Sequence, residues 1–386
     1  MTVDTYNLGD YGDMLADRVR MDAYAQALRA AVRPGSVVVD IGTGPGIMAV
    51  LACQLGASRV FAIEPCPIIQ VAREIAAANQ CAGKIEFFED ISTKVTLPIR
   101  ADVIVSDLRG VLPLAEQHIP SIADARKRFL APGGVLIARK DMIWAAVVEA
   151  PGCYARLVGP WESNTLGQDL SAARRIIVNY SPKFRFTPDQ LLVRPELWAT
   201  IDYAVVENPD IRSQLRWTVQ RNGTGHGIAA WFETELADGV RFSNAPGEPK
   251  VIYGSVFFPW LEPVHLVAGQ SLCVDLEAKL LENDYFWRWT TRIESAEKAG
   301  ETVVRFEQSQ LSGAILSPQK LRKRASTYVP QLSEDGFVRR RALDLMDGTA
   351  SLEEIARQLT AEFPDRFARW ERALTFAGTI SIESSR

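Results

Sequence analysis

The amino-acid sequence predicts an α/β protein in which a parallel sheet flanked by helices is followed by a β-rich region and a short helical region. Between residues 36 and 147, apolar runs such as VVVDIG, VFAIEP and ADVIVSD alternate with helical patterns. Strands that alternate with helices form a parallel sheet with helices on both faces. After residue 151, short β-branched and aromatic segments separated by Gly, Pro and Asn predict an antiparallel barrel or sandwich.

Each expected element follows from its local pattern. Residues 10–33 show helical spacing that stops at Arg33-Pro34-Gly35, and further helices are expected up to Leu55, over 67–80 and over 115–130. A basic stretch, LRKRAS, is expected to link the β-rich region to two helices at 337–346 and 352–363. The segments expected to be β-rich are RIIVNY, ATIDYAVV, LRWTVQR, GIAAWFETEL, VIYGSVFFPW, SLCVDLEAKLL and YFWRWTTRI.

Composition limits the class of protein. A chain of 386 residues is too long for one ordinary core, and we expect domains at 1–148, 149–320 and 321–386. The hydrophobic content of 47% and charged content of 23% are typical of globular proteins, and a net charge of −4 argues against a nucleic-acid partner.

The cysteines and the first residues of the chain indicate a reducing, cytoplasmic compartment. An odd number of cysteines, 5, without a C-x-x-C pair indicates reduced thiols rather than a disulfide framework or a metal site. The polar first residues and the absence of a long apolar run predict a cytoplasmic protein without membrane contact.

A glycine-rich turn is the most informative motif. The run VVVDIGTGPG ends a predicted strand at Asp40 and places Gly42, Gly44 and Gly46 at two-residue intervals, and a second predicted strand ends at Glu64. Glycines let the backbone approach a ligand closely, and a carboxylate after the second strand suits ribose hydroxyls. The spacing differs from the dinucleotide fingerprint G-x-G-x-x-G, so S-adenosyl-L-methionine is favoured over NAD. The alternative is any βαβ unit with a glycine-rich turn.

Five motifs, in order over roughly residues 10–318, resemble those of the protein arginine methyltransferase family. They are MLADRVRMDAY, VVVDIGTGPGIMAV, AIEP, SDLRGVLPLAE, and HGIAAWFETEL followed by SVFF. The resemblance implies a Rossmann-like class I methyltransferase domain, then a β-barrel that helps to bind a protein or peptide acceptor. It also implies a homodimer formed through an arm at about 174–190, for which an ordinary surface insertion is the alternative.

The resemblance also assigns roles on the cofactor side. Glu64 would hold the ribose diol, and Arg20 would pair with the cofactor carboxylate, unless it is a solvated helix charge. Asp40 is expected to support the glycine turn. Ser92 and Thr93 match the family's adenine contact better than Asp90 does. The full cofactor set is Met14, Arg20, Asp40, Gly42, Thr43, Gly44, Gly46, Glu64, Pro65, Asp90, Ile91, Ser92 and Ser106.

The acceptor side departs from the family pattern. The family uses two glutamates to orient and polarise the target guanidinium; the corresponding catalytic residues here are Asp107 and Glu116. Shortening an acid by one methylene retracts its carboxylate by about 1 Å, a displacement that can cost on the order of a hundredfold in rate. The family's threonine-histidine-tryptophan loop corresponds to residues 251–253, which read Val-Ile-Tyr. His118 is either a base or ligand, or a structural helix residue.

The C-terminal region carries a second, shorter resemblance. The phrase LDLMDGTASLEEIARQL is similar to small PqqD-like peptide-chaperone domains of bacterial peptide-modifying systems. That resemblance implies a winged-helix-like domain that binds the leader of a precursor peptide by strand addition. The alternatives are a helical lid or dimer element, or a DNA-reading winged helix using the basic cluster at 339–341.

Together these patterns predict a methyltransferase that uses S-adenosyl-L-methionine, without a metal, to modify a peptide or protein side chain. The leading acceptor is an arginine of a ribosomally synthesised precursor peptide. The alternatives are a methyltransferase for a small-molecule amine or hydroxyl, and a catalytically weak scaffold that binds a peptide.

Overall fold

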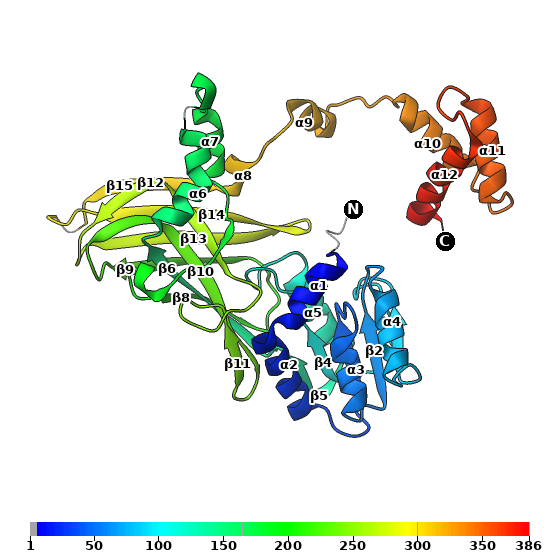
Figure 1. The fold of residues 1–386 in the computed structure, drawn as a ribbon, viewed down its shortest axis with the longest axis horizontal. Coiled ribbons are helices and arrows are strands. Elements are labelled where there is room, and N and C mark those ends of the chain that lie inside the picture. Colours follow the sequence, from blue (N-terminus) through cyan, green and yellow to red (C-terminus); the bar gives the residue numbers. More distant parts are fainter. Residues whose placement is uncertain (1–5, 164, 299, 386) are drawn as a thin grey trace. The chain divides into compact units, whose positions relative to one another are not determined.

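The computed structural model describes residues 6–163, 165–298 and 300–385 (Figure 1). The chain divides into two compact units, Met1–Ala314 and Ile315–Arg386. Within the described residues, no helix is both long and apolar enough to cross a membrane.

The first unit opens with a parallel five-stranded sheet of order β3-β2-β1-β4-β5. The order reverses on either side of β1, so the carboxyl ends of β1 and β4 border a switch point, where open α/β sheets bind ligands. The predicted parallel sheet is confirmed. Its strands are β1 Val37–Ile41, β2 Arg59–Ile63, β3 Ile85–Phe88, β4 Ala101–Ser106 and β5 Leu130–Ile137, and its helices are α1 Leu8–Ala16, α2 Arg18–Ala31, α3 Ile47–Gln54, α4 Ile69–Ala78 and α5 His118–Arg128.

Two antiparallel sheets complete the first unit. One has the order β7-β12-β10-β6-β8 with β11 paired to β10, and the other has the order β15-β14-β13-β9. The first strand of the β7-β12-β10-β6-β8 sheet in chain order, β6, begins at Lys140, directly after the parallel sheet. The strands are β6 Lys140–Val148, β7 Lys183–Phe184, β8 Glu196–Asp202, β9 Ile211–Thr218, β10 Gly223–Ala237, β11 Val240–Ser243, β12 Ser255–Leu266, β13 Ser271–Leu281, β14 Asp284–Glu294 and β15 Thr302–Ser309.

One segment expected to be β-rich is a helix. RIIVNY lies in and just after α7, Ser171–Ile177. Val178 and Asn179, which directly follow the helix, are buried. A short apolar run has no periodicity that separates a buried strand from a helix. The remaining helices of the first unit are α6 Pro151–Glu162 and α8 Gln310–Gly313, with short 3-10 turns at Thr165–Gly167 and Pro188–Gln190.

The parallel sheet and the antiparallel sheets share one hydrophobic core. Val39 of β1, Ile104 of β4, Phe232 of β10 and Phe258 of β12 are all essentially buried and belong to the same cluster. This shared core fixes the parallel sheet relative to β6 and β10, to which the loop after β4 is also bonded through Arg109.

The second unit is helical, with α9 Pro318–Arg324, α10 Glu334–Asp344, α11 Leu352–Glu362 and α12 Trp370–Ser384. Val338, Ile355, Leu359 and Ile380 are buried in a core of its own. The two predicted helices are present as α10 and α11. The sequence analysis did not anticipate α12, nor α9, which includes the first residues of the stretch LRKRAS expected to be a linker. Residues 315–385 contain no strand, so the strands of a winged helix are not found among them.

Candidate active site

The glycine turn follows β1 and is bonded to the end of β2. Gly42 N–H and Thr43 N–H both donate to the Ile63 carbonyl, at 2.8 and 3.1 Å. Gly44 has φ +52°, and a β-carbon there would lie 3.0 Å from the ring of Tyr11. Because L side chains rarely adopt that conformation, glycine is required where the backbone passes beneath Tyr11.

Two buried acids stand at the carboxyl ends of β1 and β2. Glu64 accepts hydrogen bonds from Gly44 N–H at Oε2 and from Cys66 N–H at Oε1, each at 3.0 Å. Asp40 accepts the Thr43 hydroxyl at 2.5 Å, and its burial raises its pKa to about 7. Glu64 is therefore oriented by backbone donors, and Asp40 supports the turn through a side chain.

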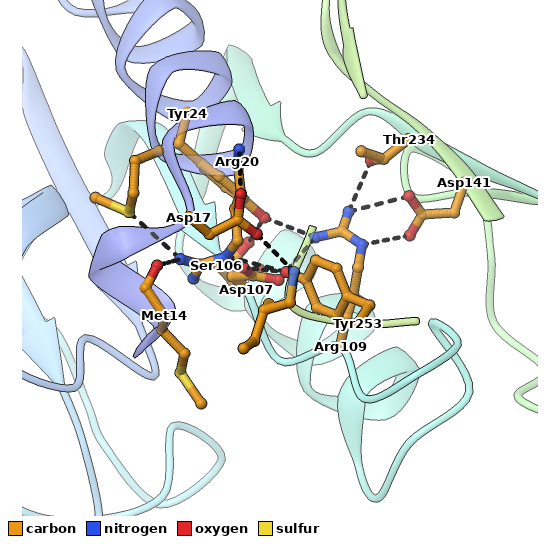
Figure 2. Close-up of polar contacts among 12 residues, drawn as sticks. Met14, Asp17, Arg20, Tyr24, Ser106, Asp107, Arg109, Asp141, Thr234 and Tyr253 are labelled. Carbon is orange, nitrogen blue, oxygen red and sulfur yellow. Dashed lines mark hydrogen bonds and ion pairs between the residues drawn. The ribbon is translucent and has the colours of Figure 1, made fainter. Parts of the chain in front are cut away.

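The start of α2 connects the two kinds of sheet (Figure 2). Asp17 caps α2 by accepting Arg20 N–H at 3.1 Å, and its second oxygen accepts Ile252 N–H at 2.7 Å. The Arg20 guanidinium donates from Nη1 to the Met14 carbonyl at 3.2 Å. From Nε it reaches Asp107 Oδ2 at 2.5 Å. Arg20 thus points from α2 toward the loop after β4.

Asp107 is the meeting point of three donors. Besides Arg20, the Tyr253 hydroxyl donates to Oδ2 at 2.6 Å and Arg109 Nη1 donates to Oδ1 at 3.2 Å. Burial alone would raise the pKa of Asp107, but the charges of Arg20 and Arg109 outweigh it and hold the pKa at about 2. The carboxylate is therefore ionised at neutral pH.

Arg109 anchors this loop to the antiparallel sheet. Its Nε and Nη2 form a two-point pair with Asp141 of β6 at 2.9 and 3.1 Å, and both side chains are at most 1% exposed. Nη2 also donates to Thr234 of β10 at 3.0 Å, and Nη1 donates to the Tyr24 hydroxyl at 2.6 Å. Tyr24 in turn donates to the Ser106 carbonyl at 3.0 Å. Figure 2 shows these side chains converging from α2, the loop after β4 and the antiparallel sheet.

Sequence reasoning did not identify Arg109 or Asp141. The available signal was a charged residue within the otherwise mostly apolar loop SDLRGVLP, followed by an acid near the start of the strand KDMIWAAVV. Buried charges are kept in folded proteins when they are paired, so each of these residues required a partner.

Glu116 lies on the exposed side of the same loop. It has φ +43°, which is unusual for a residue with a side chain. Burial first, and then the charges of Glu64 and Glu116, raise the pKa of Cys66 to about 11. The Glu116 carboxylate is therefore close enough to influence Cys66, whose N–H donates to Glu64.

His118, two residues later, faces the interior. Its Nε2 lies 2.7 Å from the Tyr203 hydroxyl, which itself donates to Asp141. Nε2 therefore carries the proton, and Nδ1 is buried without a partner among the described residues. Burial lowers the pKa of His118 to about 4. This environment favours the structural alternative for His118.

The remaining expected cofactor residues lie around the end of β3 and the loops near it. Asp90 is exposed and 3.8 Å from Lys94 Nζ, and Ile91 is also exposed. Ser92 is buried, and its carbonyl accepts Arg128 Nη2 at 2.7 Å. Pro65 is exposed, and Met14 is half-buried.

Comparisons with known proteins support the resemblance to protein arginine methyltransferases. The family described as ribosomal protein L11 methyltransferase (PrmA) matches residues 23–147. The chain is 28% identical over 240 residues to probable protein arginine N-methyltransferase 6 of Arabidopsis thaliana, covering 60% of this chain and 55% of that protein. It is 27% identical over 252 residues to protein arginine N-methyltransferase 1 of Dictyostelium discoideum, covering 63% and 74%.

Solved structures show the same fold. Protein arginine methyltransferase 10 of Arabidopsis thaliana superposes with a TM-score of 0.69 at 23% identity, covering 78% of this chain and 97% of that one. The Trypanosoma brucei PRMT1 enzyme-prozyme heterotetrameric complex with AdoHcy gives 0.72 at 19% identity, covering 78% and 98%. The chain spans about half the length of the first curated relatives that it matches, at 55% and 52%.

Proposed function

We propose that this protein is an S-adenosyl-L-methionine-dependent methyltransferase acting on a peptide or protein side chain, with arginine as the acceptor. The observation that carries the proposal is the set of groups at the carboxyl ends of three adjoining strands: the glycine turn after β1, Glu64 after β2 bonded to that turn, and Arg20 bonded to Asp107 after β4. The curated relatives named protein arginine N-methyltransferase support the same reaction.

The residues present fit the cofactor. Glu64 is a buried carboxylate that can accept ribose hydroxyls in addition to its two backbone donors, since each oxygen has two acceptor sites. In the described part of the chain, no group accepts a hydrogen bond from Arg20 Nη2. That nitrogen is suited to the cofactor carboxylate. The glycine turn presents backbone at the same edge.

When bound, the cofactor supplies a methyl group already activated on a sulfonium. The protein's part is to position the acceptor and favour its reactive form. Glu116 would accept an N–H of the acceptor and draw positive charge away from the attacking nitrogen. As that nitrogen takes the methyl group, the carbon–sulfur bond breaks and S-adenosylhomocysteine is left, and the methylated nitrogen releases one proton to solvent.

Transfer of labelled methyl groups to arginine-containing peptides tests this function. Glu116→Gln should reduce transfer about a hundredfold or more while leaving cofactor affinity within about twofold, as expected for an interaction made with the reacting group. Glu282→Gln is a matched control, because Glu282 is also an exposed glutamate with positive φ, +57°. Cofactor binding without transfer to any peptide would contradict methylation of peptides and favour the scaffold or small-molecule alternatives.

We propose that the protein works as a homodimer through the segment at about 174–190. Tyr180 within this segment is 43% exposed, and Trp161 of the neighbouring α6 is 38% exposed. The Trypanosoma brucei relative forms a heterotetrameric complex. Light scattering should show that Tyr180→Asp shifts the protein toward a monomer, whereas a dimer with unchanged affinity would contradict this arm.

We also propose that the second unit binds the leader segment of a precursor peptide. A groove in this unit exposes Phe337 at 48% beside paired charges, which suits an amphipathic segment lying against helices rather than an added strand. Tethering the substrate would raise its local concentration at the first unit. The groove is lined by Glu334, Phe337, Arg340, Arg341, Asp344, Glu362 and Phe363.

Precursor peptides encoded beside this gene provide the test. Phe337→Glu should raise KM for a peptide carrying its leader at least about tenfold and leave a short leaderless peptide unaffected. Ile382→Glu is the control, since Ile382 is 90% exposed on a different helix of the same unit. Equal KM values for Phe337→Glu and the parent would refute leader binding at this groove.

A further inference from the structure

The Asp107 carboxylate has most of its hydrogen-bonding capacity filled by the protein itself. An ionised carboxylate offers about four acceptor sites, two on each oxygen. Oδ2 accepts from Arg20 at 2.5 Å and from Tyr253 at 2.6 Å, and Oδ1 accepts from Arg109 at 3.2 Å. One acceptor site, on Oδ1, is left for an incoming group.

The donors that fill Asp107 are themselves held in place. The Tyr253 ring stacks on Phe242 at 6.1 Å with an interplanar angle of 8°, and it meets Phe232 edge-on at 5.2 Å. Arg109 is fixed by its two-point pair with Asp141. Neither donor can swing aside for a ligand without breaking packed or buried contacts.

A guanidinium normally pairs with a carboxylate through two parallel N–H···O bonds, one to each oxygen. Here Oδ2 has no site left for the second of these bonds. The Arg109 cation also already neutralises part of the Asp107 charge that would attract a positively charged acceptor.

We infer that Tyr253 and Arg109 are specificity-determining residues that limit Asp107 to a single hydrogen bond with the acceptor. A substrate arginine therefore donates only one N–H to Asp107, so Asp107 and Glu116, the predicted pair of acids, contribute differently to acceptor binding. Asp107 mainly holds Arg20 on the cofactor side. This inference rests on the proposed function, because it describes how the same site recognises its acceptor.

The test frees a hydrogen-bond acceptor site on each oxygen of Asp107, first separately and then together. Tyr253→Phe frees a site on Oδ2 while keeping the ring packing. Arg109→Met with Asp141→Asn frees a site on Oδ1 and removes the buried pair as a whole. Tyr285→Phe is the matched control, because Tyr285 is also a buried tyrosine, whose hydroxyl donates to the Pro209 carbonyl at 3.1 Å.

Binding of one peptide, carrying arginine or lysine at the target position, is measured by calorimetry with S-adenosylhomocysteine present. Each opened site should tighten arginine-peptide binding several-fold. The triple variant should tighten it about tenfold or more, the value of one charge-assisted hydrogen bond. Lysine-peptide binding should change less, since an ammonium has no planar fork.

Unchanged arginine-peptide affinity in a folded triple variant would overturn the inference. If the triple variant does not fold, unchanged affinity of Tyr253→Phe for the arginine peptide would overturn it. Because binding is measured without turnover, this result is independent of catalysis. Absence of methyl transfer by the parent protein to the arginine peptide would count against the proposed function, whatever the variants bind.

Discussion

The buried Arg109–Asp141 pair gives the sharpest prediction about stability. The two side chains are 1% and 0% exposed, and they join the loop after β4 to β6. Removing one partner of such a pair leaves an uncompensated charge in the interior, whereas removing both charges together leaves neither. The single and double variants should therefore differ strongly in the free energy of unfolding.

The structure sets the expected order of the variants. Asp141 forms its ion pair, among the described residues, with Arg109 alone, so Arg109→Met should cost about 3–5 kcal/mol. Arg109 also pairs with Asp107, so Asp141→Asn should cost less, about 2 kcal/mol. The double variant should lie within about 2 kcal/mol of the parent, because both charges are gone.

Urea unfolding monitored by tryptophan fluorescence at pH 7.5 measures these differences. Arg59→Met with Glu86→Gln is the control pair, because these side chains are 42% and 44% exposed and their ion pair should contribute less than about 1 kcal/mol. If Arg109→Met cost no more than the double variant, the charge left on Asp141 would not be the source of instability, and the reasoning would be wrong.

Four further predictions concern other parts of the chain. Burial lowers the pKa of His118 from 6.5 to about 4. The unfolded chain therefore takes up a proton below pH 6.5 that the folded chain refuses. Between pH 6.5 and 4 the parent should lose about 3 kcal/mol of stability relative to His118→Gln, as measured by urea titrations of both proteins; the raised pKa of Asp40 acts in the opposite direction in both and cancels in the difference. Glu64→Gln places an amide donor against backbone N–H groups and should weaken cofactor binding, measured by calorimetry, about tenfold or more. Gly44→Ala brings a β-carbon to 3.0 Å from the Tyr11 ring and should also weaken cofactor binding. Its far-UV circular dichroism spectrum should differ little from that of the parent. Ile355→Ala should destabilise the second unit by about 2–5 kcal/mol without moving the calorimetric transition of the first unit.

Features of the fold that depend on neighbouring residues were predictable from the sequence. The alternation of apolar runs and helical patterns predicted the parallel sheet, because periodicity reports which face of an element is buried. The glycine turn and the position of Glu64 after the second strand followed from spacing alone. In the structure these residues meet where β1 and β2 end, with Glu64 bonded to the turn at 3.0 Å.

Features that depend on contacts between distant segments were not predictable. The partners Arg109 and Asp141 are 32 positions apart, and Tyr253 is 146 positions from Asp107. Local propensity carries no information about which buried acid meets which buried base. A related limit explains RIIVNY, whose short apolar run does not distinguish a strand from the end of the helix α7.

The two departures from the family pattern are in contact with each other. In the sequence they look independent: a shorter acid at Asp107, and Val-Ile-Tyr at 251–253 in place of threonine, histidine and tryptophan. In the structure the Tyr253 hydroxyl donates to Asp107 at 2.6 Å, and Ile252 N–H donates to Asp17 at 2.7 Å. A carboxylate retracted by about 1 Å leaves space that a phenol hydroxyl fills. We therefore propose that the shorter acid and the tyrosine act together, so that Asp107 chiefly holds Arg20 rather than the acceptor.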